Sequence, residues 1–593
     1  MGEPTFRFSP RPNRAQDIHW YEWGPEAFSR AEQEDKPILL SISAVWCHWC
    51  HVMDETTYSD PRVIHRINQD YIAIRVDNDL RPDINQRYNM GGWPTTAILT
   101  PAGEVITGAT YVNPDQLLGL MDQVQQYWAA NKEQIRHQLT EPKLPTLSDR
   151  PGPDREAVNH IVNAIRQQFD RAYGGVGAMP KFPQPDVWEL ALVNFLATGD
   201  GSTAGMAVRT LDAMAGSNLY DQTAGGFFRY STTREWTIPH FEKMLEDNAQ
   251  LARLYLRAFQ ILGDDTYRQL VDHLLGWANR TLLNPDGLWG GSQDADEEYY
   301  RLPPEGRQQR PEPGVDPVVY THANAQMISA QLLAASLINP GQYAPIALTA
   351  LEALYDRMWD DEEGLFHADN GETRFLPGLL IDVAWLGHAL LDGYEYTGDT
   401  VFLERVQTLL DYADRTLSDG RVYWDQIERP DGLGRLKHRQ QPLNENAVMA
   451  RLWLRLGTLL ENDAHLERGR AMVGALGEFA KEQGIFGAGW ALAADMAEAP
   501  PLTATIVESA NHSGADLRRA IFGVYDRRRA VRSLMVGTPE FQASGLPDIP
   551  LPALYICRGT ACAAPVTEPE GILGALQSLL SGLETNNPAL TPE

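Results

Sequence analysis

Six short loops that combine glycine with an aromatic residue recur along the chain, and no other feature of the sequence constrains the fold as much. Their first glycines stand at positions 174, 225, 287, 364, 420 and 484, so the intervals are 51, 62, 77, 56 and 64 residues. Each interval has room for two helices, and the pattern predicts six helical hairpins. The loops are Tyr173-Gly174-Gly175, Gly225-Gly226-Phe227-Phe228, Gly287-Leu288-Trp289-Gly290, Gly364-Leu365-Phe366, Gly420-Arg421-Val422-Tyr423-Trp424 and Gly484-Ile485-Phe486.

Hairpins with such a long period stack either as an open solenoid or as a closed ring. Six hairpins favour closure, and we expect an (α/α)6 toroid with all six loops at one end, where they form an aromatic-lined funnel. In the alternative interpretation, which is the stronger one for any single loop, the glycines end helices and the aromatic rings cap the core.

The first 140 residues alternate strand and helix signals instead. Buried strands are expected at 36–43, 71–76 and 95–100, with a further strand near 105–106 and a helix over 114–138. This order, βαβ followed by a hairpin and a helix, predicts a separate α/β domain.

A proline-rich segment at 141–154 predicts a linker between the two units. Beyond residue 500, short strands and helices alternate again, which indicates a small α/β appendix. The expected organisation is therefore residues 1–140, a linker at 141–154, a toroid over 155–499 and an appendix over 500–593.

Charge and hydropathy narrow the classes of function. The formal net charge of -29 disfavours nucleic acid and anionic membrane surfaces as partners. No segment approaches the 18 consecutive apolar residues of a membrane span, and the N-terminus carries no apolar targeting region. We expect a cytoplasmic protein.

The cysteine motif carries the clearest chemistry. Cys47 and Cys50 follow a buried strand and open a helix, where the helix N-terminus stabilises a thiolate. Cys47 is the predicted nucleophile toward a disulfide, and Cys50 is the resolving thiol. His48, when protonated, would lower the pKa of Cys47 further. Pro94 precedes the strand at 95–100, the position of the cis-proline that faces such cysteines.

Three other interpretations of the motif stay open. Cys47-His48-Trp49-Cys50-His51 matches the pattern for c-type haem attachment, which belongs mainly to exported proteins. Cys47 and Cys50 with a nearby histidine would suit zinc, although the sequence identifies no fourth ligand. The third interpretation is a pair of thiols with no chemical role. We expect no bound metal and no cofactor.

Several longer motifs resemble the thioredoxin-domain proteins related to spermatogenesis-associated protein 20. They extend over almost the full chain. The motifs are Trp20-Tyr21-Glu22-Trp23, Cys47-His48-Trp49-Cys50-His51-Val52-Met53, Gly91-Gly92-Trp93-Pro94, Pro180-Lys181-Phe182-Pro183, Gly225-Gly226-Phe227-Phe228-Arg229-Tyr230-Ser231, Pro239-His240-Phe241-Glu242-Lys243-Met244-Leu245, Gln293-Asp294-Ala295-Asp296 and Tyr555-Ile556-Cys557.

The resemblance implies a thioredoxin-like domain joined to a six-hairpin toroid of the type found in glycosidases and N-acylglucosamine epimerases. It implies no particular substrate. Two departures bear on activity: Ser41 stands where thioredoxins carry a buried Asp, and Thr321-His322-Ala323-Asn324 replaces the Asp-Trp-Asn that is usual in the family.

The toroid offers candidates for sugar chemistry, which requires one protonated and one ionised carboxyl group about 5–9.5 Å apart. An epimerase would instead need a base such as His240, His322 or His388. Glu242 is expected on a helix that opens at Pro239-His240. For each single carboxylate, a structural role at a helix end is the stronger interpretation. The residues expected in the toroid pocket are His240, Glu242, Asp294, Asp296, Trp289 and Arg229.

The leading hypothesis from sequence is a thiol-disulfide oxidoreductase whose partner is a protein disulfide or thiol, with a toroid that binds a carbohydrate-like small molecule. The alternatives are a sugar hydrolase or epimerase centred on the toroid with a regulatory thioredoxin-like domain, and a non-catalytic binding protein. Cys557 and Cys562 are either a second redox pair that exchanges with the first or ordinary buried thiols.

Overall fold

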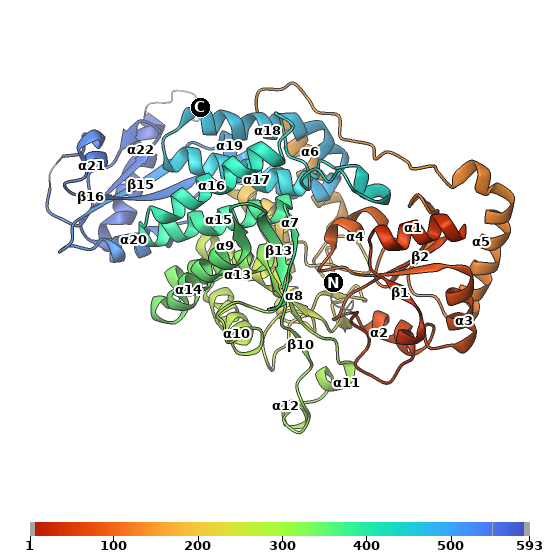
Figure 1. Ribbon diagram of the computed structural model, residues 1–593. Helices are drawn as coiled ribbons and strands as arrows, with labels where there is room; N and C mark the ends of the chain where they lie inside the picture. The colour runs from red at the N-terminus through yellow and green to blue at the C-terminus, as the bar shows by residue number, and fades with distance from the viewer. Residues whose placement is uncertain (1–5, 548, 586–593) are drawn as a thin grey trace.

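The computed structural model describes residues 6–547 and 549–585, which form three folded parts in a row (Figure 1). Residues 1–5, 548 and 586–593 belong to the predicted first and last parts and lie outside the described residues. The segment 141–154, predicted as a linker, contains neither helix nor strand and runs across the molecule from the first part to the second.

The N-terminal part is a five-stranded sheet in the order β1-β3-β2-β4-β5. The first three of these strands are parallel, and β4 and β5 each run antiparallel to their neighbour. The expected thioredoxin-like fold is confirmed. The strands are β1 (Trp20–Tyr21), β2 (Ile38–Ser43), β3 (Ile72–Asp77), β4 (Thr95–Leu99) and β5 (Val105–Ala109), and the helices are α1 (Pro25–Glu34), α2 (His48–Glu55), α3 (Pro61–Asp70), α4 (Pro82–Tyr88) and α5 (Pro114–Ile135).

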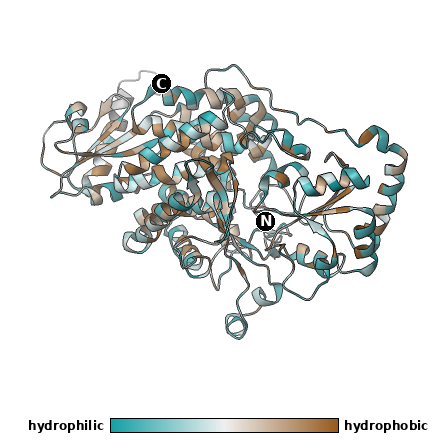
Figure 2. Ribbon diagram, in the orientation of Figure 1, coloured by the Kyte–Doolittle hydropathy of each residue, from teal (hydrophilic) through white to brown (hydrophobic). Residues whose placement is uncertain are grey.

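Helices cover both faces of this sheet, so its central strands are apolar on both sides (Figure 2). Leu39 and Ile98 pack with α3 and α5 on one face, and Leu40 and Ile74 pack with α1 and α4 on the other. Leu436 from the second part of the chain is buried in the latter core, so the two domains share apolar contacts.

The second part is a closed ring of helices. Each of six inner helices packs against the next, and the last packs against the first. This arrangement is the expected (α/α)6 toroid. The inner helices are α7 (Pro185–Thr198), α9 (Leu245–Leu262), α13 (Thr321–Leu337), α15 (Leu380–Thr397), α17 (Leu443–Leu459) and α19 (Ala488–Glu498). The outer helices are α6 (Arg155–Gln168), α8 (Gly201–Ala215), α10 (Asp265–Thr281), α14 (Pro340–Met358), α16 (Val401–Thr416) and α18 (Asp463–Glu482).

The ring closes by pairing its two chain ends. Five outer helices follow their inner partner directly in sequence, whereas α6, the first helix of the ring, packs against α18 and the final inner helix α19. The sixth pair is therefore built from opposite ends of the toroid sequence.

All six glycine-aromatic loops connect an outer helix to the next inner helix, so they lie at one end of the ring. These connections also carry short strands that sequence analysis did not predict. The strands are β6 (Tyr230–Ser231), β7 (Pro239–His240), β8 (Lys243–Met244), β9 (Ser292–Gln293), β10 (Val315–Asp316), β11 (Val319–Tyr320), β12 (Trp359–Asp360), β13 (Gly364–Asp369) and β14 (Arg374–Pro377).

Inner-helix asparagines hold three of these loops. The side chain of Asn324 accepts a hydrogen bond from the Trp289 amide at 2.8 Å and donates to the Trp289 carbonyl at 2.9 Å. Asn248 with Phe227, and Asn446 with Tyr423, repeat the same pair of bonds.

The three aromatic rings that these asparagines hold are fully buried in the core. An aromatic-lined funnel is therefore wrong for these loops. The structural interpretation is right, because a buried ring and its satisfied peptide group both stabilise the loop.

The C-terminal part is a sheet in the order β16-β15-β17-β18 with helices α20 (Ala515–Phe522), α21 (Pro539–Ser544) and α22 (Ile572–Thr585). A disulfide joins Cys557 on β17 (Ala553–Arg558) to Cys562 on β18 (Ala561–Cys562), with the two Cα atoms 4.0 Å apart. The other strands are β15 (Leu502–Glu508) and β16 (Arg529–Met535).

This second disulfide lies at the opposite end of the molecule from the N-terminal domain (Figure 1). The toroid separates it from Cys47 and Cys50, so the direct exchange considered from sequence has no short path within one molecule. Among the described residues, no helix has both the length and the apolar character needed to cross a membrane.

The asparagine bonds predict a large effect of one small substitution. Asn324→Ala would leave the amide and carbonyl of Trp289 buried without partners, and we expect the free energy of unfolding to fall by about 2–4 kcal/mol. Urea unfolding followed by circular dichroism measures the free energy of unfolding. Asn163→Ala, at an exposed position of α6, should change that free energy by less than about 0.5 kcal/mol. Equal effects of the two variants would contradict this role of Asn324.

Candidate functional site

The inner helices begin around a cavity of about 200 Å³ that the N-terminal domain covers. Its wall combines the start of α4 and the preceding loop with the first turns of several inner helices. The lining residues are Asn78, Asp79, Pro82, Asp83, Gln86, Met244, Glu246, Gly291, Tyr320, His322, Ala323, His367, Leu379, Ile381, Asp425 and Glu445.

Buried polar contacts fix the N-terminal domain over this cavity. The Arg87 guanidinium donates to Asp425 Oδ2 at 2.8 Å, and both side chains are almost fully buried. His367 Nε2 donates to the backbone carbonyl of Asp79 at 2.9 Å. Because these bonds join the two domains at the cavity itself, the N-terminal domain is part of the site and forms its cover.

Four inner helices each place an ionisable side chain on their second or third residue. These are Glu246 on α9, His322 on α13, Asp382 on α15 and Glu445 on α17. The ring brings the N-termini of these helices together, and their dipoles favour negatively charged groups there. Residues far apart in sequence therefore meet at one place.

His322 lies between two carboxylates. Its Nε2 is 3.3 Å from Glu246 Oε2, and its Nδ1 is 3.5 Å from Asp382 Oδ1. Burial opposes the charged imidazolium, but the two carboxylates outweigh it and raise the pKa of His322 to about 10. His322 keeps the pKa of Glu246 below its usual range, and His367 followed by His322 does the same for Asp382, in both cases against burial.

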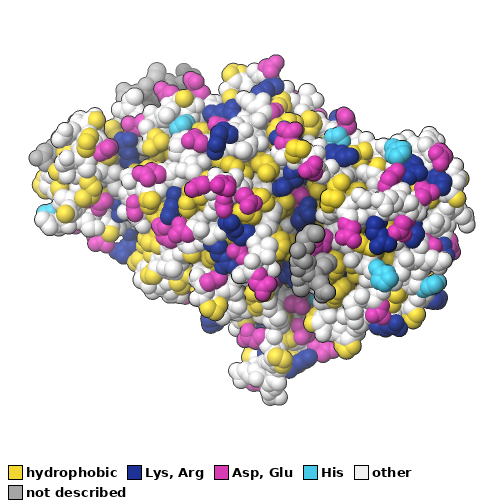
Figure 3. Space-filling view, viewed as in Figure 1, with side chains coloured by type: hydrophobic (Ala, Val, Ile, Leu, Met, Phe, Trp, Pro, Cys, Tyr) yellow, Lys and Arg dark blue, Asp and Glu magenta, His cyan; other side chains and the backbone are white. Residues whose placement is uncertain are grey.

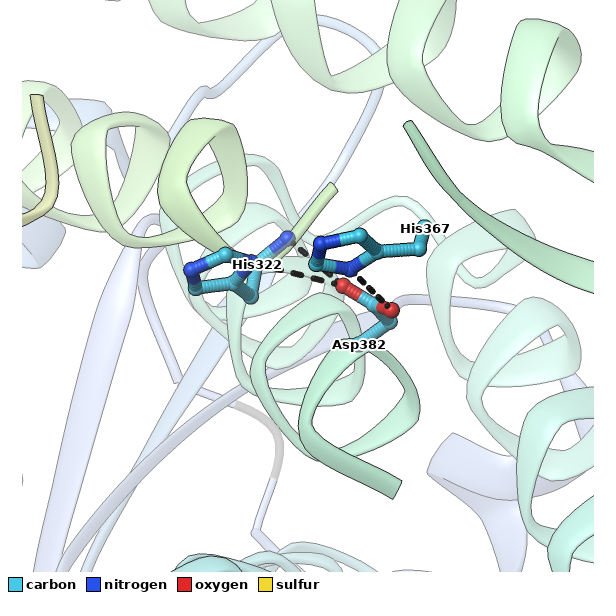
Figure 4. Close-up of side chains that lie close together, drawn as sticks. All are labelled: His322, His367 and Asp382. Carbon is cyan, nitrogen blue, oxygen red and sulfur yellow. Dashed lines mark hydrogen bonds and ion pairs between the residues drawn. The ribbon is translucent and has the colours of Figure 1, made fainter. Parts of the chain in front are cut away.

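His367 and Asp382 complete this cluster (Figure 4). His367 Nδ1 is 2.9 Å from Asp382 Oδ2, and the His322 and His367 rings stack with centroids 5.3 Å apart. One ligand atom from each of the three residues lies within 4.8 Å of the others, which is close enough to hold a metal such as zinc. A metal there would have to replace the hydrogen bonds that Asp382 makes, since the same atoms take part in both.

Two other carboxyl groups of the cavity have the opposite electrostatic behaviour. Burial raises the pKa of Glu445 to about 7. Burial, followed by repulsion from Asp77 and Asp316, raises the pKa of Asp79 to about 7 as well. The cavity thus combines an ionised carboxylate, Glu246, with carboxyl groups that exchange protons near neutral pH.

The predicted cysteine site lies where the sequence placed it. Cys47 and Cys50 are bridged, with their Cα atoms 5.2 Å apart, at the N-terminus of α2. The amide of Cys50 donates to Cys47 Sγ at 3.2 Å. The peptide bond between Trp93 and Pro94 is cis, as expected. His48 is half-buried beside the exposed ring of Trp49, and its predicted effect on Cys47 stays a prediction.

Residues of the toroid pack over this motif, and both cysteines are buried, with exposed fractions of 4% and 2%. The guanidinium of Arg229 lies 4.4 Å from the centre of the Trp46 ring and 4.6 Å from that of Trp93. Met244, which also lines the cavity, packs against the buried cluster of Trp46, Cys47 and Cys50, the cysteine cluster. Arg229 was expected in the toroid pocket, but it belongs to the cover of the cysteines.

Glu242 and His240 lie outside the cavity lining. We expected a helix to open at Pro239, but the short strands β7 and β8 occupy 239–240 and 243–244, and α9 begins only at Leu245. The physical reason for the later helix start is Lys243, which is fully buried and pairs with Asp221 at 2.8 Å. This pair holds residue 243 in the extended backbone of β8. The first turn of the helix therefore carries Glu246 in place of Glu242.

The other residues expected in the pocket have structural contacts. Asp294 lies 3.3 Å from His51 of the N-terminal domain, and Asp296 caps the short helix α11 (Glu297–Tyr300). Trp289 is fully buried and donates to Asn279. None of the three is in the cavity lining.

Of the cavity's ionisable groups, sequence reasoning named only His322, as a possible base. Glu246, Asp382 and Glu445 were missed, although each stands near the start of the inner helix that follows a glycine-aromatic loop. That common position was the available signal. His367 and Asp79 had no comparable signal, because the first is on β13 and the second is in a loop of the other domain.

The fold and site define a thioredoxin-like domain placed over the open end of a helical toroid. Residues 11–143 match the family model Thioredox_DsbH, whose description is a protein of unknown function, DUF255. The chain is also 35% identical to spermatogenesis-associated protein 20 of Homo sapiens over 324 residues, which are 50% of this chain and 40% of that protein. The resemblance found from sequence is confirmed, and the alignment spans about two fifths of that relative.

Two more distant likenesses concern single parts. The thiol:disulfide interchange protein DsbD of Campylobacter jejuni is 31% identical over 99 residues, 15% of this chain and 17% of that protein. The cellobiose 2-epimerase from Spirochaeta thermophila superposes with a TM-score of 0.42 and 17% identity, and the match covers 60% of this chain and 86% of that one.

The environment of His322 predicts a pH-dependent contribution to stability. Because its pKa is raised in the folded protein, the contribution is complete below about pH 6.5 and is lost as the pH rises toward about 10. The stability advantage of the wild type over His322→Gln should therefore shrink between these values in urea unfolding. His65→Gln, at an exposed position of α3, should show no such trend. A constant advantage of the wild type would contradict the ion pairs.

Proposed function

We propose that the chain is an enzyme that transfers protons to or from a small polar, carbohydrate-like ligand in the cavity at the covered end of the toroid. One observation carries the proposal: Glu246, His322 and Glu445, from three different inner helices, converge on one cavity. Convergent polar groups in a cavity are typical of ligand sites.

The electrostatics support acid-base chemistry. Glu445, with a pKa of about 7, exchanges its proton near neutral pH and suits a general acid. Glu246 stays ionised beside His322 and would accept hydrogen bonds from ligand hydroxyl groups. A proton donor and an ionised carboxylate on one cavity are what the hydrolysis of a glycosidic bond or the epimerisation of a sugar requires.

The N-terminal domain would act as a regulatory cover. The side chains of Asp79 and Met244 face the cavity, and both also contact the cysteine cluster, Asp79 through the Trp46 indole at 2.6 Å. Reduction of Cys47 and Cys50 would therefore act on the wall of the cavity, and the cover would limit the access of water.

A second candidate is thiol-disulfide exchange with a protein partner. The observation that favours it is the cysteine pair at the start of α2 with the cis bond before Pro94. In the cytoplasm, the location expected from sequence, the pair would be kept reduced. Because the toroid buries both sulfur atoms, a partner would reach them only after the cover opens.

Glu445→Gln tests the acid-base proposal. We expect wild-type protein to convert at least one sugar of an oligosaccharide panel, as followed by NMR in deuterated water, with a rate that falls above about pH 7. Glu445→Gln should lower kcat by about 10²-fold, since a general acid contributes that much or more, with an unchanged melting temperature. Glu305→Gln, an exposed carboxyl group, is the control.

Two results would refute the acid-base proposal. One is a wild-type protein that neither converts any sugar of the panel nor changes its melting temperature with one. The other is full activity of Glu445→Gln.

Arg229→Ala tests the cover over the cysteines. Loss of its contacts with Trp46 and Trp93 should speed the reduction of Cys47–Cys50 by dithiothreitol about tenfold, because cation-π contacts contribute about 0.5–2 kcal/mol each. Mass spectrometry of the alkylated peptides separates this pair from Cys557–Cys562. Arg268→Ala, on the surface of α10, should leave the rate unchanged. An unchanged rate in Arg229→Ala would mean that Arg229 does not hold the cover.

A further inference from the structure

A second cavity lies at the opposite end of the toroid, where the inner helices end. It has a volume of about 100 Å³ and is lined by side chains from all six inner helices. The segment 522–529 of the C-terminal part, which leads from α20 into β16, forms the remaining wall. By size, this space has room for several water molecules or one phosphate group.

The lining is rich in arginine. Seven arginines and four carboxylates line the cavity, in a chain whose formal net charge is -29. The acidic and basic side chains of the outer surface are mixed on the face seen in Figure 3, without a single basic patch. The arginine-rich cavity therefore differs from the mixed charge on that face.

Most of the carboxylates in the lining are already paired. Asp392 and Glu395 both accept from Arg455 at 2.6 Å, and Asp526 accepts from Arg558, which is outside the lining. Arg527 pairs with Asp495. These pairs leave five arginines against one carboxylate, Glu189.

Among the described residues, the other five arginines of the lining make no ion pair. They are Arg253, Arg257, Arg451, Arg528 and Arg529. Arg451 and Arg529 each have a buried Nε without a hydrogen-bond partner, although Nη1 of Arg529 donates to backbone carbonyls of residues 521, 522 and 524. Arg253 is near the Trp385 ring at 5.4 Å but makes no hydrogen bond within the described part of the chain.

Burial of this charge is unfavourable without a counter-ion. Burial lowers the pKa of Arg253 to about 10, and it does the same for Arg529. A folded protein tolerates such groups when a bound ligand supplies the missing charge and acceptors, since uncompensated buried charge is strongly destabilising.

We propose that this cavity binds a small oxoanion carrying a phosphate group, held by Arg253, Arg451 and Arg529. These arginines approach from α9, α17 and the start of β16, three different sides. Guanidinium groups that converge from several directions match the oxygens of a tetrahedral anion better than those of a planar carboxylate. Inorganic phosphate and a phosphorylated small metabolite share this chemistry.

A bound phosphate would also join two parts of the molecule. Arg253 and Arg451 belong to the toroid, whereas Arg529 belongs to the C-terminal sheet. One anion between them would stabilise the docking of the C-terminal part. This site is independent of the acid-base cavity, which is at the other end of the ring.

Binding is tested with the full chain and inorganic phosphate. We expect 10 mM phosphate, on the order of 100 times a sub-millimolar Kd, to raise the melting temperature by about 2–4 °C over chloride of equal ionic strength. Glucose 6-phosphate against glucose separates a phosphorylated metabolite from the free ion, since tighter binding of the former identifies the metabolite as the better ligand.

Variants identify the site. Arg451→Met and Arg253→Met should each weaken phosphate binding by at least about tenfold in isothermal titration calorimetry, without lowering the melting temperature in chloride. Arg451→Lys keeps the charge and should be intermediate. Arg268, a half-buried arginine of α10 outside the cavity lining, is the control as Arg268→Gln.

Three outcomes would overturn the proposal. The first is a wild-type protein that does not respond to phosphate, and the second is equal binding by all variants. The third is a response to citrate without one to phosphate, which would assign the cavity to a carboxylate. A variant that fails to fold is replaced by Arg529→Met in the same measurement.

Discussion

The toroid depends on the hydrogen bonds between inner-helix asparagines and the loops before them. A loop that enters the core carries polar backbone groups that water cannot reach, and Asn248, Asn324 and Asn446 each satisfy the N–H and the C=O of one loop residue. Each asparagine stands one or two residues after an ionisable residue of the cavity, Glu246, His322 or Glu445. The bond that stabilises the loop therefore also fixes the first helical turn, so fold stability and site geometry depend on the same positions.

The N-terminal domain uses a familiar fold in an unusual place. In a thioredoxin-like fold the cysteines and the cis-proline form an open surface for a partner, whereas here Arg229 and Met244 of the same chain occupy that surface. The toroid is thus in the position of a permanent partner. The Trp46 indole, beside the cysteines, donates to Asp79 in the cavity wall, so the cysteine motif and the cavity lie next to each other.

Much of the architecture could be predicted from the sequence, because periodicity and glycine-aromatic loops reflect local rules. The strand at Ile38–Ser43 and the cysteine motif after it are examples. The site could be predicted only in part. Glu242 was chosen because a proline was expected to open its helix, but the buried Lys243–Asp221 pair delays the helix. His367 reaches the cavity through strand pairing and domain docking, which no local pattern reveals.

The pairing of α6 with α19 has a consequence for synthesis on the ribosome. The ring cannot close until residues 488–498, its last inner helix, have left the exit tunnel. Until then the other helices of the toroid form an open arc whose ends carry unpaired apolar faces. The N-terminal domain, complete much earlier, can dock on the growing arc through Arg87 and Leu436 only after residues 425–438 exist. Cover and ring are thus completed almost together, late in translation, and a chain truncated before α19 would expose the apolar faces of α7 and α17 that pack against it.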